Sequence, residues 1–123
     1  MTNKPSPKEL ANRELARREL ARYLRNFIDY TFEDPRGFKF NWHHDEIIKK
    51  LQKVENGEIK RLMIFMPPRH GKSEIGSVRF PAYLMGKNKD RQIIQASYSG
   101  DLATDFGRQV RNLVNSEQYR KVF

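Results

Sequence analysis

The chain has 123 residues, no cysteine, and 24 Lys and Arg against 15 Asp and Glu, which gives a formal net charge of +9. This length allows one domain at most, or a piece of a larger one, and the lack of cysteine excludes disulfides, thiol catalysis and zinc–thiolate sites. The longest apolar run, Leu62 to Met66, is far shorter than the roughly 20 residues that cross a bilayer. No apolar stretch follows Met1, so no secretory signal is expected and a cytosolic chain fits best. The basic excess favours a polyanionic partner, nucleic acid or nucleotide phosphate, and a solvated basic surface is the alternative.

Residues 1–37 are expected to form a flexible lead and one helix. Residues 1–7 carry two prolines and little apolar material. Over residues 8–32 the apolar side chains recur on one stripe, which predicts a single helix; the stripe consists of Leu10, Ala16, Leu20, Ala21, Leu24, Phe27 and Ile28. The arginines of this helix could contact DNA or another subunit, although a solvated face is the commoner explanation for such charges. Residues 34–37 have the composition of a turn.

Three further helices are predicted after this turn. Asn41 is a candidate N-cap for a helix that runs to about Glu55, and Asn56-Gly57 is expected to end it. A helix should start near Gly71 and run toward Met85, with a kink or restart at Pro81. The last helix should begin at about Asp101, because its apolar residues then share one face.

Two short apolar runs have the composition of strands. Leu62–Met66 is predicted to be a strand buried on both faces of a parallel sheet, and Gln92–Ala96 is the second strand. The order strand, helix, strand, helix is typical of a parallel α/β sheet, here preceded by two helices. From about residue 60 onward, the chain is therefore expected to form part of a parallel α/β sheet.

The sharpest motif lies where the first predicted strand meets the next helix, at Met66-Pro67-Pro68-Arg69-His70-Gly71-Lys72-Ser73. It has the Gly-Lys-Ser end of a phosphate-binding loop, with methionine where the usual pattern has its first glycine. Backbone N–H groups at a helix start attract phosphate, Gly71 allows close approach, Lys72 supplies charge and Ser73 a hydroxyl for Mg²⁺. A chance Gly-Lys-Ser on a basic surface turn is the alternative.

These residues resemble the N-terminal ATPase segment of the large terminase subunit of tailed bacteriophages. The resemblance covers about residues 38–123, and the Pro-Pro-Arg-His-Gly-Lys-Ser form without the first glycine is itself a variant of that family. Further similar stretches are Trp42 to Ile48, Ile93 to Ala103, Gly107 to Arg111, and Tyr119 to Phe123.

The resemblance implies a fold and a site. The fold would be an additional-strand, helicase-like P-loop ATPase, incomplete in this chain. ATP and Mg²⁺ would be the cofactors, with Arg69 and Lys72 in catalytic roles and Ser73 on Mg²⁺. The nucleotide-binding residues would be Pro68, Arg69, His70, Gly71, Lys72, Ser73 and Glu74, together with Trp42, His43 and His44 near the adenine.

Each of the less specific residues has a plainer alternative. Arg69 could be a salt-bridged loop arginine, and Trp42 could be an aromatic residue packed on the core. A metal site at residues 43–46 is disfavoured, because adjacent helical residues point in different directions. Residues 97–99 could touch nucleic acid, but capping of the last helix by Ser99 is the simpler interpretation.

The resemblance also implies partners and a place of action. It predicts a motor that couples ATP hydrolysis to the translocation of double-stranded DNA into a procapsid, in the cytoplasm of the bacterial host. Its partners would be the small terminase subunit, the portal protein and further copies in a homo-oligomeric ring. No membrane partner is expected.

One element of such a motor is missing from the sequence. Hydrolysis in this class needs an apolar strand that ends in Asp-Glu, and none of the acids after Glu74 follows an apolar run; they are Asp90, Asp101, Asp105 and Glu117. We therefore expect a chain that is truncated before the Asp-Glu strand, binds ATP without hydrolysing it and folds only marginally. The alternatives are another P-loop ATPase, such as a helicase or a small kinase, and a basic nucleic-acid-binding module without nucleotide chemistry.

Overall fold

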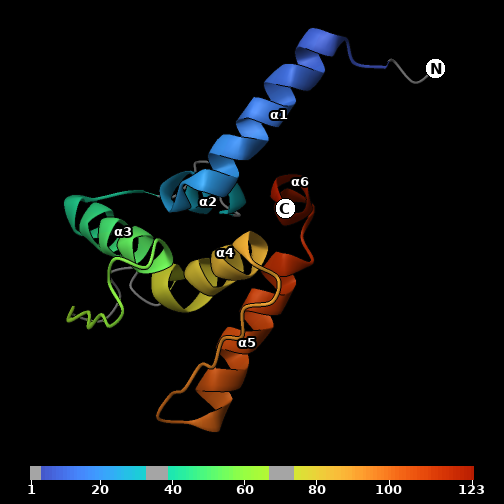
Figure 1. Ribbon diagram of the computed structural model, residues 1–123. Coiled ribbons are helices and arrows are strands. Elements are labelled where there is room, and N and C mark those ends of the chain that lie inside the picture. The colour runs from blue at the N-terminus through green and yellow to red at the C-terminus, as the bar shows by residue number, and fades with distance from the viewer. Residues whose placement is uncertain (1–3, 33–38, 67–73) are drawn as a thin grey trace.

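The computed structural model describes residues 4–32, 39–66 and 74–123. These residues form short helices joined by irregular segments (Figure 1). The helices are α1 (Pro7–Arg22), α2 (Leu24–Thr31), α3 (Trp42–Glu55), the π-helix η1 (Glu74–Arg79), α4 (Phe80–Lys87), α5 (Gly100–Val114) and α6 (Glu117–Val122).

The described residues contain no β-strand, so the prediction of a parallel α/β sheet is wrong. Both predicted strands, Leu62–Met66 and Gln92–Ala96, are irregular segments. Within the described ranges, no backbone hydrogen bond joins one of these segments to the other. A strand gains its hydrogen bonds only from a neighbouring strand, whereas a helix makes them within itself. The helices therefore pack on one another, and no sheet separates them.

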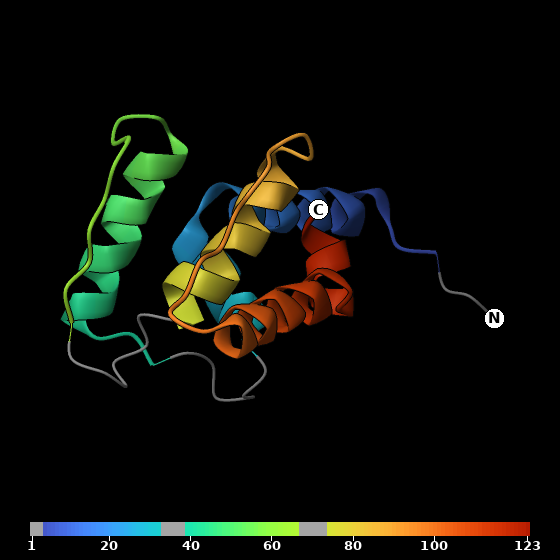
Figure 2. The same cartoon turned by 90° about the horizontal axis from the view of Figure 1, so that it is seen from below.

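Figure 2 shows residues 59–66 running beside α3. In Figure 1, residues 88–98 run from the end of α4 toward the start of α5. Leu62, Ile64 and Met66 are half-buried, whereas Met63 and Phe65 are 82% and 87% exposed. The first segment is therefore covered on one face, not on two as its apolar sequence predicts.

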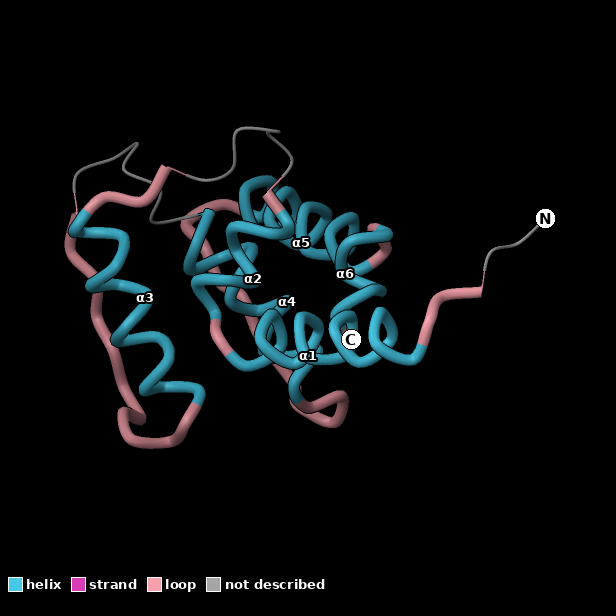
Figure 3. Tube along the Cα trace, turned by 90° about the horizontal axis from the view of Figure 1, so that it is seen from above, coloured by secondary structure: helices cyan, strands magenta, loops and turns pink. Residues whose placement is uncertain are grey.

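The hydrophobic core lies among the helices that surround α4. Figure 3 shows α1, α2, α4, α5 and α6 gathered together, with α3 at the side. The fully buried side chains with the largest volume are Tyr83, Phe27, Leu24, Ile28, Ile75 and Val122. The Phe27 ring lies 5.5 Å from Tyr83, 6.0 Å from Tyr119 and 5.8 Å from Phe123, measured between ring centroids. These aromatic contacts join α2, α4 and the C-terminal end of the chain.

The helix predicted over residues 8–32 is two helices, separated at Tyr23. Tyr23 has φ −116° and ψ 120°, an extended conformation that interrupts the helical hydrogen bonds. Side chains from other helices satisfy groups at this break: Tyr83 Oη donates to the Arg22 carbonyl at 2.7 Å, and the Leu24 N–H donates to Gln52 Oε1 at 3.0 Å. The break is thus stabilised by contacts that are distant in sequence.

The helices predicted after Asn41 and from about Asp101 are confirmed, whereas the helix start predicted near Gly71 lies outside the described residues. α3 starts after Asn41 and ends at Glu55, and Gly57 follows it with a positive φ of 82°. Pro81 lies in the first turn of α4, as expected for a restart. Ser99 caps α5, because its Oγ accepts a hydrogen bond from the Leu102 N–H at 3.1 Å. The short helix α6 is an addition that the sequence pattern did not predict.

None of the helices in the described part of the chain is long and apolar enough to cross a membrane.

Candidate nucleotide-binding site

The predicted phosphate loop lies between two described segments. Residues 67–73, which include the candidates Pro68, Arg69, His70, Gly71, Lys72 and Ser73, fall outside the described residues. The described chain ends at Met66 before the loop and resumes at Glu74 after it. The assignments of the loop residues, including Ser73 as a Mg²⁺ ligand, therefore stay predictions. The strand that should lead into the loop is absent, so the described residues do not show the strand–loop–helix frame of a P-loop fold.

The π-helix η1 begins at Glu74, the first residue after the loop. Glu74 Oε1 accepts a hydrogen bond from Nε of Arg79 at 2.9 Å, in an ion pair. Residues five apart lie on different faces of an α-helix, where neighbouring side chains are three or four positions apart. The i→i+5 hydrogen bonding of a π-helix changes this spacing and brings the two charged groups together. The π-helix therefore sets the position of the Glu74 carboxylate.

Arg79 also connects η1 to the end of α2. Its Nη1 donates to the carbonyl oxygen of Thr31 at 2.9 Å and to Thr31 Oγ1 at 3.2 Å. The guanidinium lies over the Phe32 ring, 5.7 Å from its centroid. The arginine side chain is only 7% exposed. A buried guanidinium must replace its lost hydration with hydrogen bonds, and the Thr31 and Glu74 oxygens supply them.

A cavity of about 330 Å³ opens beside this ion pair. Its walls come from the end of α2, from η1, and from α5 and the start of α6, and its polar groups are mostly amides and hydroxyls. The lining residues are Thr31, Phe32, Glu74, Val78, Arg79, Gln109, Asn112, Leu113, Ser116 and Gln118. This volume is at the lower end of the range for small-molecule sites, roughly 300–1,000 Å³. One of the lining residues, Glu74, directly follows the predicted phosphate loop in the sequence.

The predicted adenine-contacting residues open helix α3. The Trp42 side chain is 80% exposed, so its ring is open to a stacking partner and is not packed on the core. His44 is buried, and its Nδ1 accepts a hydrogen bond from the Asn41 N–H at 3.1 Å. The His43 and His44 ring centroids lie 4.0 Å apart, and those of Trp42 and His43 lie 5.8 Å apart. His44 thus has a capping role at the start of α3, which its position in the sequence did not reveal.

The described residues include no group of His, Cys, Asp or Glu side chains that could hold a metal ion. Tyr98, in the stretch considered for nucleic-acid contact, is 94% exposed.

Sequence reasoning identified Glu74 but missed Arg79 and Thr31. An arginine five residues after a glutamate gives no pairing signal when the segment is predicted to be α-helical. Thr31 is 48 residues from Arg79 in the chain, and nothing in the sequence links the two.

Part of the sequence matches a known protein family. Residues 63–122 match the family "Terminase large subunit, T4likevirus-type, N-terminal". This match confirms the resemblance found in the sequence: residues 63–122 are similar to the N-terminal part of the large terminase subunit, whose family is an ATPase family with a role in phage DNA packaging. Neither the curated proteins nor the solved structures contain a match to this chain.

Proposed function

We propose that this chain is the nucleotide-binding part of a phage DNA-packaging ATPase and that it binds Mg-ATP through residues 68–74. The observation that carries the proposal is the family match, because the matched residues, 63–122, include Gly71-Lys72-Ser73. In this proposal Lys72 contacts the β- and γ-phosphates, Ser73 ligates Mg²⁺ and Arg69 braces the γ-phosphate. Pro68, His70 and Gly71 shape the loop around the phosphates.

The described residues on either side of the loop fit a supporting part in this site. Glu74 presents a carboxylate directly after Ser73 with 30% of its side chain exposed, so it is open to a ligand while Arg79 holds one oxygen. Trp42 presents a largely exposed ring that can stack on adenine, and His43 lies against it. His44 would act indirectly, because its ring is buried and caps the helix that carries Trp42.

We expect that the 123-residue chain does not hydrolyse ATP by itself. The acids after Glu74 are Asp90, Asp101, Asp105 and Glu117. Asp105 accepts a hydrogen bond from Gln109 and pairs with Arg108, and Asp101 lies in the first turn of α5, as helix-surface acids commonly do. Measurable release of phosphate that disappears in Lys72→Ala would refute this expectation.

In the full motor, the proposed partners are double-stranded DNA, the small terminase subunit, the portal protein and further copies of the ATPase in a ring. The net charge of +9 supports a polyanionic partner.

A thermal melt with and without Mg-ATP tests the proposal. A ligand at 100 times its dissociation constant stabilises the state that binds it by about 2.7 kcal/mol. We expect Mg-ATP to raise the Tm of the wild type and of Lys89→Ala, which removes an exposed lysine outside residues 66–74 and serves as the control. Lys72→Ala should melt at the same temperature with and without the nucleotide.

A wild-type melt that does not respond to Mg-ATP would contradict nucleotide binding. The second candidate, a basic nucleic-acid-binding module, would then be favoured by the charge of the chain. It predicts DNA binding that falls steeply with salt concentration and does not depend on ATP.

A further inference from the structure

Arg79 is a buried charged residue that neither the sequence motifs nor the family match assigns to a function. It is 6% exposed as a residue, and its guanidinium bonds to oxygens of two different helices. Nε pairs with Glu74, and Nη1 donates to both oxygens of Thr31. Among the described residues, Nη2 has no hydrogen-bond partner. The side chain borders the cavity between α2, η1 and α5.

Stability alone is a weak explanation for this arrangement. A buried ion pair gains little or nothing over a well-packed apolar pair, because both charges lose their hydration. The ion pair does fix the orientation of the Glu74 carboxylate, because a guanidinium is planar and donates its hydrogen bonds in fixed directions. Thr31 ends α2 and its side chain is itself fixed, with Oγ1 donating to the Phe27 carbonyl at 2.7 Å. The fully buried Phe27 anchors that end of α2 in the aromatic core. A series of hydrogen bonds thus connects Phe27 in the core to Thr31, Thr31 to Arg79, and Arg79 to the Glu74 carboxylate.

We propose that Arg79 is a positioning residue for Mg-ATP binding, which it supports by fixing the Glu74 carboxylate against the end of α2. This inference rests on the proposed function, in which Glu74 belongs to the nucleotide site. Arg79 does not touch the nucleotide itself. It holds Oε1 of Glu74, and the Glu74 side chain remains 30% exposed.

The test is a double-mutant cycle on Mg-ATP affinity, measured by titration calorimetry on the full chain. The variants are Arg79→Gln, Glu74→Gln and the combination of both. At metal sites, loss of a residue that supports a ligand typically weakens affinity by roughly 10-fold or more. We expect about this loss in each single variant and little further loss in the double variant, because Arg79 acts through Glu74.

Arg25→Gln is the matched control. Arg25 also forms an ion pair, with Asp45 at 3.0 Å, and lies over the Phe40 ring, but it is 53% exposed and far from Glu74 in sequence. Its removal should leave the Mg-ATP affinity unchanged. The unfolding midpoint of every variant is measured in parallel, so that lost affinity can be separated from lost folded protein.

The outcomes separate the possible explanations. Arg79→Gln with a lower Tm but wild-type Mg-ATP affinity would overturn the inference and leave the proposed function standing. The same would follow if Arg79→Gln weakened binding equally in the presence and absence of Glu74→Gln. Absence of Mg-ATP binding by the wild type would refute the proposed function, and the inference with it.

If Arg79→Gln does not fold, Arg79→Lys takes its place. Lysine keeps the charge but lacks the planar fork that reaches Glu74 and Thr31 together. An intermediate loss of affinity is then expected, and wild-type affinity would overturn the inference.

Discussion

Helices α1 and α2 follow one another in the chain, yet they are held by different forces. α1 has 16 residues and buries none of them. α2 has eight residues and buries four, Leu24, Phe27, Ile28 and Thr31. In Figure 1, α1 extends away from the other helices toward the N-terminus, whereas α2 lies among them.

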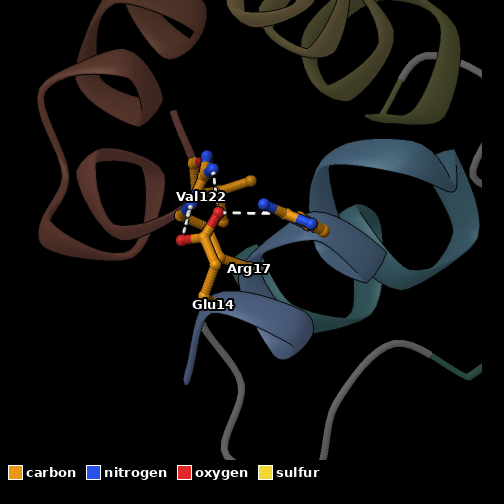
Figure 4. Close-up of polar contacts among 4 residues, drawn as sticks. Glu14, Arg17 and Val122 are labelled. Atoms are coloured by element: carbon orange, nitrogen blue, oxygen red, sulfur yellow. Dashed lines mark hydrogen bonds and ion pairs between the residues drawn. The ribbon is translucent and has the colours of Figure 1, made fainter. Parts of the chain in front are cut away.

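Local interactions stabilise α1 along its length, while its half-buried Leu20 and Ala21 pack against the core. Ser6 and Glu9 form a capping box: Ser6 Oγ accepts from the Glu9 N–H at 3.2 Å, and Glu9 Oε2 accepts from the Ser6 N–H at 2.7 Å. Glu14 pairs with Arg17 and Arg18, at 2.7 and 3.0 Å. Arg17 also donates to the Val122 carbonyl at 3.1 Å, which ties the middle of α1 to α6 (Figure 4).

The comparison separates two ways of stabilising a helix. Isolated helices of this length are marginal in water, and most helical stability in proteins comes from packing an apolar face. α1 should therefore open locally at a low free energy, whereas α2 should open only when the whole structure unfolds. Three substitutions test this difference, in order of decreasing effect.

Phe27→Ala should have the largest effect, because it removes the ring at the centre of the aromatic cluster. Loss of a fully buried phenylalanine destabilises a domain by about 3–5 kcal/mol. A shift of the urea midpoint, or complete loss of cooperative unfolding, would show this. Leu15→Ala is the control on α1: its side chain is 60% exposed, and a change of less than about 0.5 kcal/mol is expected. Equal effects at the two sites would contradict the distinction between the helices.

Ser6→Ala should have a smaller effect that is confined to α1. Replacing an N-cap serine by alanine costs about 1 kcal/mol of helix stability. We expect faster hydrogen exchange of the α1 amides, with the exchange of α2 and the urea midpoint nearly unchanged. A full drop in the global midpoint would instead show that α1 unfolds together with the core.

Glu14→Gln should have the smallest effect, and that effect should depend on pH. Hydrogen bonds from Arg17 and then Arg18 lower the pKa of Glu14 from 4.5 to about 2. A carboxyl group with a lowered folded-state pKa adds stability above its unfolded pKa and loses it as the pH falls through the folded value. The wild type should therefore exceed the variant in α1 stability near pH 6, and the difference should vanish between pH 4.5 and pH 2. Both partners are exposed, so salt should reduce the difference.

The candidate site was predictable in part. The Gly71-Lys72-Ser73 motif was evident from the sequence and lies within the family match over residues 63–122, while the roles of its residues stay predictions. The exposed ring of Trp42 keeps open its proposed contact with adenine, whereas His44 proved to be a buried capping residue. The contacts of Arg79 with Glu74 and Thr31 could not be predicted, because the first depends on a π-helix and the second joins residues 48 positions apart.

The sequence by itself determined the helices whose signals are local. The start of α3 after Asn41, the restart at Pro81 and the cap at Ser99 each depend on residues within one turn. Helical hydrogen bonds connect residues four apart, so a short stretch of sequence contains both partners.

Only the tertiary structure decided the break at Tyr23 and the absence of a sheet. Beside Tyr23, the Leu24 N–H donates to Gln52 of α3, and the Arg22 carbonyl accepts from Tyr83 of α4. Leu62–Met66 and Gln92–Ala96 have the composition of strands, but a strand exists only when another segment lies beside it and pairs with it. Composition shows which secondary structure a segment prefers. The tertiary structure decides whether a neighbouring segment is present to form the backbone hydrogen bonds of a sheet.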